Sequence, residues 1–302
     1  MEAIHKLFGD CKPITEEEAN NIVNDLSSSL KELGIDFRIL GSFNKKVEGS
    51  LYNDIDIAVK YPFENGSELV SKICKEKEDK TKLGKINEKF NTITISYKVK
   101  EDHDAQVDFM FCDSVEYANF VFHSPDFKKQ ESKYKGMYQS ALMMAAISCV
   151  PPEDINKKYT VEYFSDTDYN GKYKTKDKQV KTFWKLNFDQ NKGLTIHQKT
   201  WEGKTKPLAN PQTVKGTEEV ITKDINKIIK LCFGDKAIKE DFNSFESTIA
   251  LLVSERYKYC NNNFLHRVRE TFLNDWQIKM KTSPELLKEL GDLLTEEINN
   301  VD

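Results

Sequence analysis

The sequence has few of the features that would assign it at once to a narrow class. It has six cysteines in 302 residues, far apart and without a C-x-x-C pair, so we expect free thiols in a reducing cytosol. The longest apolar stretch, residues 141–150, is about half of what a membrane-spanning helix needs. Residues 1–13 lack the apolar core of a secretory signal. We therefore expect a cytoplasmic protein without a membrane partner. The sequence gives no indication of its oligomeric state.

There is also no excess of positive charge over the whole chain. The net charge of −4 does not suit a protein that binds nucleic acid over its whole surface. Residues 172–206, however, hold ten lysines against three acids, with aromatic residues among them. Lysines with interleaved aromatics are typical of a nucleic-acid surface, but a strand with its aromatics in the core and its lysines in water has the same composition. The aromatics concerned are Phe183, Trp184, Phe188 and Trp201.

Hydrophobic periodicity predicts an α+β protein. Its first part is a small mixed β-sheet with helices, followed by a β-rich antiparallel segment and a helical C-terminal region. The character changes after Pro151-Pro152, so we predict one domain over 1–150 and a second over 151–302. The predicted helices are 15–33, 66–80, 114–121, 132–149, 217–233, 244–261, 263–280 and 284–299. The predicted strands are 36–40, 54–59, 91–99 and 105–112, with hairpins over 158–201.

Two of these strands carry carboxylates in an apolar context. In "DIDIAV" the period of two puts Asp54 and Asp56 on one face and the apolar residues on the other. In "QVDFMF" Asp108 is a lone acid, and burying it is costly unless it is paired or bound to a metal. If the two strands are neighbours, the three carboxylates converge. Clusters of this kind hold Mg²⁺, and two such ions can activate a hydroxyl and stabilise a leaving pyrophosphate.

The pair Gly41-Ser42 precedes this cluster at the end of the first predicted strand. Glycine allows a close approach of the backbone, and the N–H groups of the following loop could hold a triphosphate. A second pair, Gly49-Ser50, is separated from Asp54 by only three residues, too few for a phosphate-binding loop, and we predict a turn there.

Taken together, these residues resemble the DNA polymerase β-like nucleotidyltransferase superfamily. The signature is a helix, a Gly-Ser pair, an Asp-x-Asp on the next strand and a third acid on a later strand. It covers about residues 15–112, and Asn53 stands where many members have a serine. The resemblance implies transfer of a nucleotidyl group from a nucleoside triphosphate (NTP). Asp54, Asp56 and Asp108 would be the catalytic residues and would bind two Mg²⁺ ions, with Asp108 activating the acceptor hydroxyl, and Gly41 and Ser42 would bind the triphosphate.

Lysines on two segments are further candidates for the triphosphate. Lys45 and Lys46 follow Gly41-Ser42, but solvated loop lysines fit the pattern equally well. In the superfamily the segment after the third acid often contacts the nucleotide. Lys133 and Lys135, with Ser132, could therefore reach its phosphates, and a capped helix with surface lysines is the alternative.

The acceptor is open at this point. The lysine-rich β segment favours nucleic acid, such as an RNA or tRNA 3′ end. A protein side chain (AMPylation), a second nucleotide (synthesis of an oligonucleotide signal) and a small molecule remain alternatives. A non-catalytic nucleic-acid-binding module on the same fold is the alternative of another class, although Gly41-Ser42 and all three acids are present.

Overall fold

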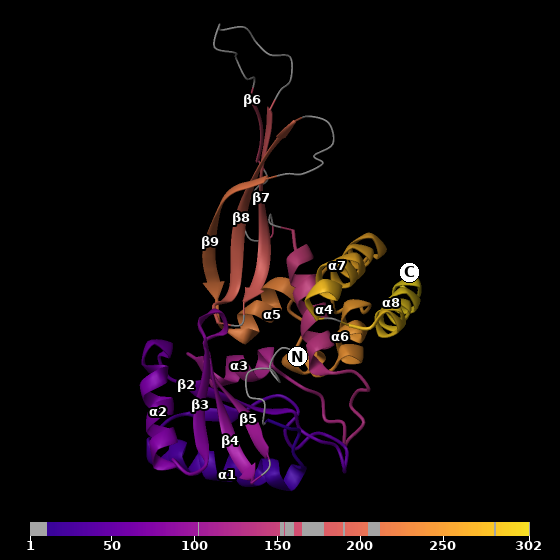
Figure 1. Ribbon diagram of the computed structural model, residues 1–302. Coiled ribbons are helices and arrows are strands. Elements are labelled where there is room, and N and C mark those ends of the chain that lie inside the picture. The colour runs from indigo at the N-terminus through magenta and orange to yellow at the C-terminus, as the bar shows by residue number, and fades with distance from the viewer. Residues whose placement is uncertain are drawn as a thin grey trace, which may run out of the picture. The chain divides into compact units, whose positions relative to one another are not determined.

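The computed structural model describes residues 11–101, 103–151, 154, 160–164, 178–189, 191–204, 212–280 and 282–301 (Figure 1). The chain divides into two compact units. Unit 1 comprises Met1–Ser140 and the short segment Phe242–Ser247, and unit 2 comprises Ala141–Asp241 and Thr248–Asp302. The predicted α+β class is confirmed. The predicted domain boundary at 150 stays a prediction, since the division into units does not follow a single cut of the chain.

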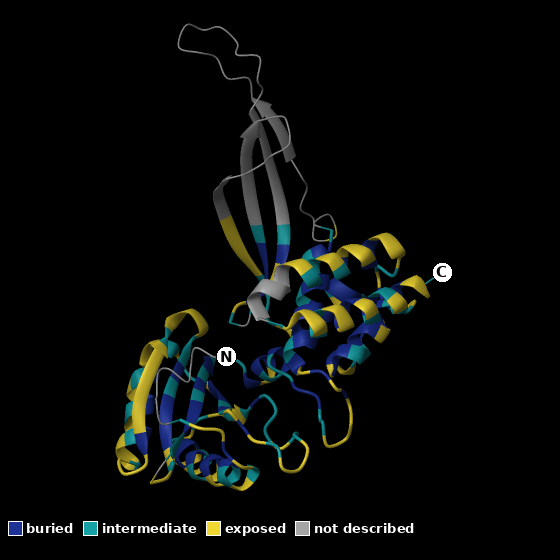
Figure 2. Ribbon diagram, turned by 45° about the vertical axis from the view of Figure 1, so that its right-hand side comes forward, coloured by how far each residue is buried: buried dark blue, intermediate teal, exposed yellow. Residues whose placement is uncertain are grey.

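Unit 1 is built on a five-stranded mixed sheet in the order β1-β2-β5-β4-β3. β2 and β5 pair in parallel, and the other neighbours pair antiparallel. Figure 2 shows β3 as the exposed edge of this sheet. The strands are β1 (Phe37–Ile39), β2 (Asp54–Lys60), β3 (Thr81–Asn87), β4 (Thr92–Lys100) and β5 (His103–Cys112).

Two helices, α1 (Glu16–Glu32) and α2 (Gly66–Glu76), cover one face of this sheet. α1 begins with a capping box, in which the Thr15 hydroxyl accepts from the Glu18 N–H and the Glu18 carboxylate accepts from the Thr15 N–H. Its apolar face is fully buried at Leu26 and Leu30, each contributing about 1.5–3 kcal/mol of hydrophobic stabilisation. The strands contribute the odd-numbered residues of β2 and β5 to the same core, which leaves their even-numbered residues on the opposite face.

On that opposite face, α3 (Val115–Val121) covers only the end of the sheet where β2 and β5 finish. Val115 and Ala118 of α3 pack with Ala58 of β2, and Met110 lies against this small cluster. Asp54, Asp56 and Asp108 lie on the same face, nearer the beginning of the strands. The fold therefore places the acids beside α3 and away from the α1–α2 core.

Unit 2 combines a four-stranded antiparallel sheet, in the order β6-β7-β8-β9, with helices. The strands confirm the predicted hairpins, and the helices confirm the helical C-terminal region. The strands are β6 (Thr160–Phe164), β7 (Lys178–Asp189), β8 (Gly193–Lys204) and β9 (Gln212–Thr222). The helices are α5 (Ile225–Phe233), α6 (Phe245–Leu252), α7 (Asn262–Met280) and α8 (Pro284–Asn299), while α4 (Gly136–Cys149) begins in unit 1, as does α6.

Several predicted boundaries are wrong in informative ways. The predicted helix 217–233 is strand β9 as far as Thr222, and α5 begins only after Asp224, whose carboxylate accepts from the Lys227 N–H. The predicted helix 244–261 ends at Leu252. The predicted helix 132–149 begins at Gly136, and residues 132–135 lie ahead of it outside the helix, with a bend at 133–134. Strand β3 was not predicted at all.

Among the described residues, none of the helices is both long and apolar enough to cross a membrane. The six cysteines are free thiols.

Candidate metal centre

The sheet brings the three predicted carboxylates together. The parallel register pairs Asp56 of β2 directly with Asp108 of β5, and Asp54 lies one pleat before Asp56 on the same face. One ligand oxygen of each residue lies within 4.8 Å of the others. The predicted convergence of the three acids is therefore confirmed, and their role as metal ligands stays a prediction.

The electrostatic state of the cluster reflects this crowding. Burial, and then the charges of Asp54 and Asp108, raise the pKa of Asp56 well above its usual range. Burial also raises the pKa of Asp108, but hydrogen bonds from Thr94 and Gln106 oppose the effect. Without a cation the ionised form of Asp56 is therefore disfavoured, because the carboxylate is buried and two further carboxylates lie beside it.

The Gly-Ser turn lies directly against this cluster. Gly41 has a φ of +66°, a conformation that favours glycine. A methyl group added at Gly41 would stand 3.3 Å from Asp56 Oδ2, so the absence of a side chain lets this carboxylate approach the turn backbone closely. The turn is closed by the Lys45 N–H, which donates to the Ser42 carbonyl at 3.0 Å. The second pair, Gly49-Ser50, lies in a turn, as predicted.

The donor set of the cluster fits Mg²⁺. All three side chains offer carboxylate oxygens, which are the ligands that Mg²⁺ prefers, and no thiolate or imidazole takes part. Gly41 has no side chain where Asp56 Oδ2 approaches, since an added methyl group would stand 3.3 Å from that oxygen. Asp54, Asp56 and Asp108 would hold the ions.

The candidate lysines have different surroundings. Lys45 is half-buried and its Nζ donates to the Ser124 carbonyl at 2.7 Å. Lys133 has its Nζ 4.9 Å from the centroid of the Tyr134 ring. The Ser132 hydroxyl is buried and donates to the Glu246 carboxylate at 2.6 Å, within unit 1. Their predicted contacts with phosphate stay predictions.

Lys46 lies closer to the acids. Its Nζ donates to the Leu51 carbonyl at 2.6 Å and lies 4.6 Å from the Tyr52 ring centroid, at the approach to β2. Burial lowers the pKa of Lys46, the charge of Asp54 opposes this, and the charge of Lys135 adds to the lowering. Lys46 therefore shares the electrostatic surroundings of Asp54.

Two residues of the site were not singled out from the sequence. Thr94 of β4 and Gln106 of β5 donate to the two oxygens of Asp108. Alternation in "NTITISYKV" places Thr94 on one face of its strand, but only the register of β4 on β5 sets it opposite Asp108. That register is not readable from the sequence, because an irregularity between Lys98 and Lys100, at the hairpin end, shifts the pairing of β4 with β5.

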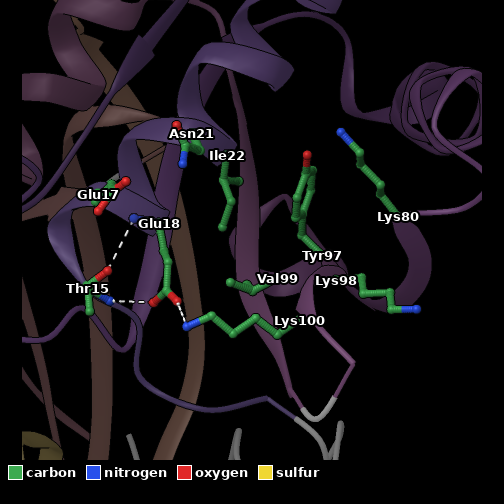
Figure 3. Close-up of a pocket in the computed structure, with 10 residues that line it drawn as sticks. All are labelled: Thr15, Glu17, Glu18, Asn21, Ile22, Lys80, Tyr97, Lys98, Val99 and Lys100. Carbon is green, nitrogen blue, oxygen red and sulfur yellow. Dashed lines mark hydrogen bonds and ion pairs between the residues drawn. The ribbon is translucent and has the colours of Figure 1, made fainter.

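A pocket of about 530 Å³ lies elsewhere in unit 1, between α1 and β4 (Figure 3). In Figure 3, Glu18 accepts from Thr15 and pairs with Lys100, while Lys80 and Lys98 extend away from that group. Tyr97 and Val99 of β4 line it, on the face that packs on α1. None of the three acids lines this pocket. Its lining is Thr15, Glu17, Glu18, Asn21, Ile22, Lys80, Tyr97, Lys98, Val99 and Lys100.

The predicted nucleic-acid surface falls largely on side chains outside the described residues, including those of Phe183, Trp184 and Trp201. Phe188 is buried. Lys192 is exposed and forms an ion pair with Glu218 of β9, which also lies 3.4 Å from His197. The ion pair with Glu218 therefore offsets the positive charge of Lys192, one of the ten lysines of residues 172–206.

Comparison with known proteins adds no assignment, since no family model and no curated protein matches the chain.

Proposed function

We propose that the chain is a Mg²⁺-dependent nucleotidyltransferase that moves a nucleotidyl group from an NTP to an acceptor hydroxyl. One observation carries the proposal: one ligand oxygen each of Asp54, Asp56 and Asp108 lies within 4.8 Å of the others, beside the turn at Gly41, where an added methyl group would stand 3.3 Å from Asp56 Oδ2. The resemblance to the DNA polymerase β-like superfamily, stated above on the same residues, agrees with this chemistry.

The chain's own residues would divide the work as follows. The three carboxylates would hold the ions, which would supply positive charge to the triphosphate and lower the pKa of the attacking hydroxyl. The backbone at Gly41 and Ser42 contacts the phosphates, and Lys46 offers a nearby positive charge. Asp108 would accept the proton of the acceptor hydroxyl.

The acceptor remains to be identified. Nucleic acid is the acceptor that the lysine-rich segment favours, and a protein side chain, a second nucleotide and a small molecule share the same chemistry. The alternative that is not an enzyme is a nucleic-acid-binding module, which would have the same fold but would not react with NTPs. It would have no need for three mutually repelling carboxylates, so the enzyme is the better reading of the site.

The test is incorporation of label from each of the four NTPs, supplied one at a time with a radioactive α-phosphate. Each reaction contains Mg²⁺ and a pool of RNA, single-stranded DNA or cell protein. The control is the double variant Asp54→Ala/Asp56→Ala, with Asp104→Ala as a matched control because Asp104 lies on β5 outside the cluster.

Label transferred by the wild type and by Asp104→Ala, but not by the double variant, would support the proposal and identify base and acceptor class together. Label in a small soluble product would place the acceptor among nucleotides or small molecules. Equal transfer by the double variant would refute the role of the cluster. Nucleic-acid binding by wild type and double variant alike, without turnover of any NTP, would favour the binding module.

A further inference from the structure

The Asp108 carboxylate is held at both of its oxygens. Thr94 Oγ1 donates to Asp108 Oδ1, and Gln106 Nε2 donates to Asp108 Oδ2 at 2.8 Å. Thr94 lies directly opposite Asp108 in the antiparallel pairing of β4 and β5, and Gln106 precedes Asp108 by one pleat on the same face. The two donors therefore come from two strands of a rigid sheet and fix the plane of the carboxylate.

Both donors are neutral, which matters for a group that is to hold a cation. A lysine or arginine partner would orient Asp108 but would also cancel its charge. A hydroxyl and an amide orient it and leave the charge in place. Each carboxylate oxygen has two lone pairs, so one on each oxygen stays available after the hydrogen bond is made.

A second hydroxyl–carboxylate hydrogen bond between β4 and β5 can be compared with the one from Thr94 to Asp108. Ser96 lies one pleat from Thr94 on β4, is buried, and donates its hydroxyl to Asp104. This is the same kind of hydrogen bond on the same pair of strands, but Asp104 is not part of the cluster of three acids. The contact at Asp108 can thus be separated from the general contribution of such bonds to the sheet.

We propose that Thr94 and Gln106 are positioning residues of the metal centre, which fix Asp108 so that the centre favours a small divalent cation over Ca²⁺. Mg²⁺ and Mn²⁺ demand near-octahedral geometry at short distances, whereas Ca²⁺ accepts variable coordination and carboxylates that bind through both oxygens. A carboxylate that cannot turn favours the first kind of ion. The proposal rests on the proposed function, because it needs the three acids to bind metal.

The experiment is titration of the full chain with Mn²⁺ alone, followed by electron paramagnetic resonance of the free ion, and with Ca²⁺ in competition. The variants are Thr94→Val and Gln106→Leu, each of which removes one donor at similar size. Thr94→Ser restores a hydroxyl, and Ser96→Ala is the matched control. Thermal melting without metal verifies that each variant is folded.

We expect Thr94→Val and Gln106→Leu to bind Mn²⁺ about 10- to 100-fold more weakly, with a smaller loss for Ca²⁺. Thr94→Ser should recover most of the affinity, and Ser96→Ala should bind as the wild type does. If one of the two donor variants does not fold, the Mn²⁺ affinity of the other, compared with the wild type and Thr94→Ser, still tests the positioning role.

The outcomes separate the two proposals. Wild-type binding of Mn²⁺ that Asp54→Ala/Asp56→Ala abolishes supports the metal centre. If the donor variants then bind Mn²⁺ as tightly as the wild type, or Ser96→Ala weakens binding equally, the positioning role is refuted and the proposed function stands. If the wild type does not bind Mn²⁺, the metal centre falls and the positioning role with it.

Discussion

At the scale of single residues, Lys45 and Lys46 are neighbours in sequence with different surroundings. Lys45 Nζ is held by the Ser124 carbonyl, so its ammonium joins the loop after β1 to the segment before α4. Lys46 Nζ lies at the approach to β2 and shares the electrostatic surroundings of Asp54. The sequence predicted a phosphate contact for the pair without distinguishing them, because the direction of a loop side chain depends on tertiary contacts.

The two lysines should therefore differ on substitution. Lys46→Ala should raise the KM for the NTP about tenfold or more with a smaller effect on kcat, because a charged contact to phosphate contributes about 1.5–3 kcal/mol. Lys45→Ala should mainly lower the melting temperature. Steady-state kinetics and thermal melting on both variants test this prediction. A raised KM for Lys45→Ala together with a lowered melting temperature for Lys46→Ala would contradict it.

The raised pKa of Asp56 predicts a pH dependence of stability without metal. A group whose pKa is higher in the folded state stabilises the fold below its unfolded pKa, and this contribution is lost as pH rises through the folded pKa. Asp56→Asn removes the charge at constant size. We expect it to be more stable than the wild type at neutral pH without metal, with the difference vanishing in acid. Urea unfolding across pH measures this, and a destabilised variant at neutral pH would contradict it.

Glu18 should affect the pH dependence of stability in the opposite direction to Asp56, because its pKa is lowered in the folded protein. The hydrogen bond from Lys100, followed by that from the Thr15 backbone, lowers the pKa of Glu18 to about 2. Its contribution is therefore present above the unfolded pKa and is lost as pH falls toward 2. Glu18→Ala also breaks the capping box and should cost about 1 kcal/mol at neutral pH. The same urea series should show this loss shrinking in acid, and a loss independent of pH would contradict the assignment.

At the scale of elements, the start of α4 depends on Gly136. A methyl group there would stand 1.9 Å from the His123 carbonyl oxygen, which is backbone and cannot turn away. The predicted helix 132–149 began four residues too early because its hydrophobic pattern does not register this contact. The close approach of two backbones sets the beginning of α4, so glycine is needed for space there.

Gly136→Ala should therefore be strongly destabilising, by about 1–3 kcal/mol or more, as is usual when atoms are forced into a packed region. Gly49→Ala is the matched control, since Gly49 has a φ of +79° with nothing within 4 Å of an added methyl group. It should cost only the strain of its backbone, about 1–2 kcal/mol. Thermal melting that ranks Gly49→Ala as the more damaging would contradict the steric argument.

The elements that the sequence predicts well are those whose pattern is local. Asp54 and Asp56 share a face because β2 has a period of two, and α1 begins directly after Thr15, the N-cap residue of its capping box. β3 escapes the same reasoning: "TKLGKIN" is an exposed edge strand with little apolar alternation, and it forms only because β4 offers a partner. The second half of β9, residues 217–222, was predicted as the start of a helix, although four of these six residues are β-branched and favour a strand, as their pairing with β8 shows.

At the scale of the whole molecule, unit 1 is completed by a segment about one hundred residues further along the chain. Phe242 packs edge-on against Phe120, Phe245 packs against Tyr134, and Glu246 accepts from the buried Ser132 hydroxyl. No local sequence pattern indicates that Phe242–Ser247 belongs to unit 1, so the sequence predicted a single domain boundary near residue 150. The segment that leads from α3 to α4 is therefore held in part by residues of a later element.

This return predicts that a fragment cut at residue 150 folds poorly. The fragment would expose surfaces at Phe120 and Tyr134 that the full chain covers with Phe242 and Phe245, both of which are buried. In the full chain, Phe245→Ala should destabilise unit 1 by about 3–5 kcal/mol, the usual cost for a buried phenylalanine. Phe90, which is exposed and lies between β3 and β4, offers a matched control. Phe90→Ala should lower the free energy of unfolding far less than Phe245→Ala.

Hydrogen exchange read out by mass spectrometry would locate the loss. With Phe245→Ala, we expect faster exchange in residues 120–135, while β2 and β5 stay protected because their core with α1 and α2 does not involve Phe245. A fragment 1–150 as stable as the full chain, or unchanged exchange in residues 120–135, would contradict the role of the returning segment. Uniformly faster exchange across the five-stranded sheet would mean that the segment supports the whole of unit 1, including the strands that carry the acids.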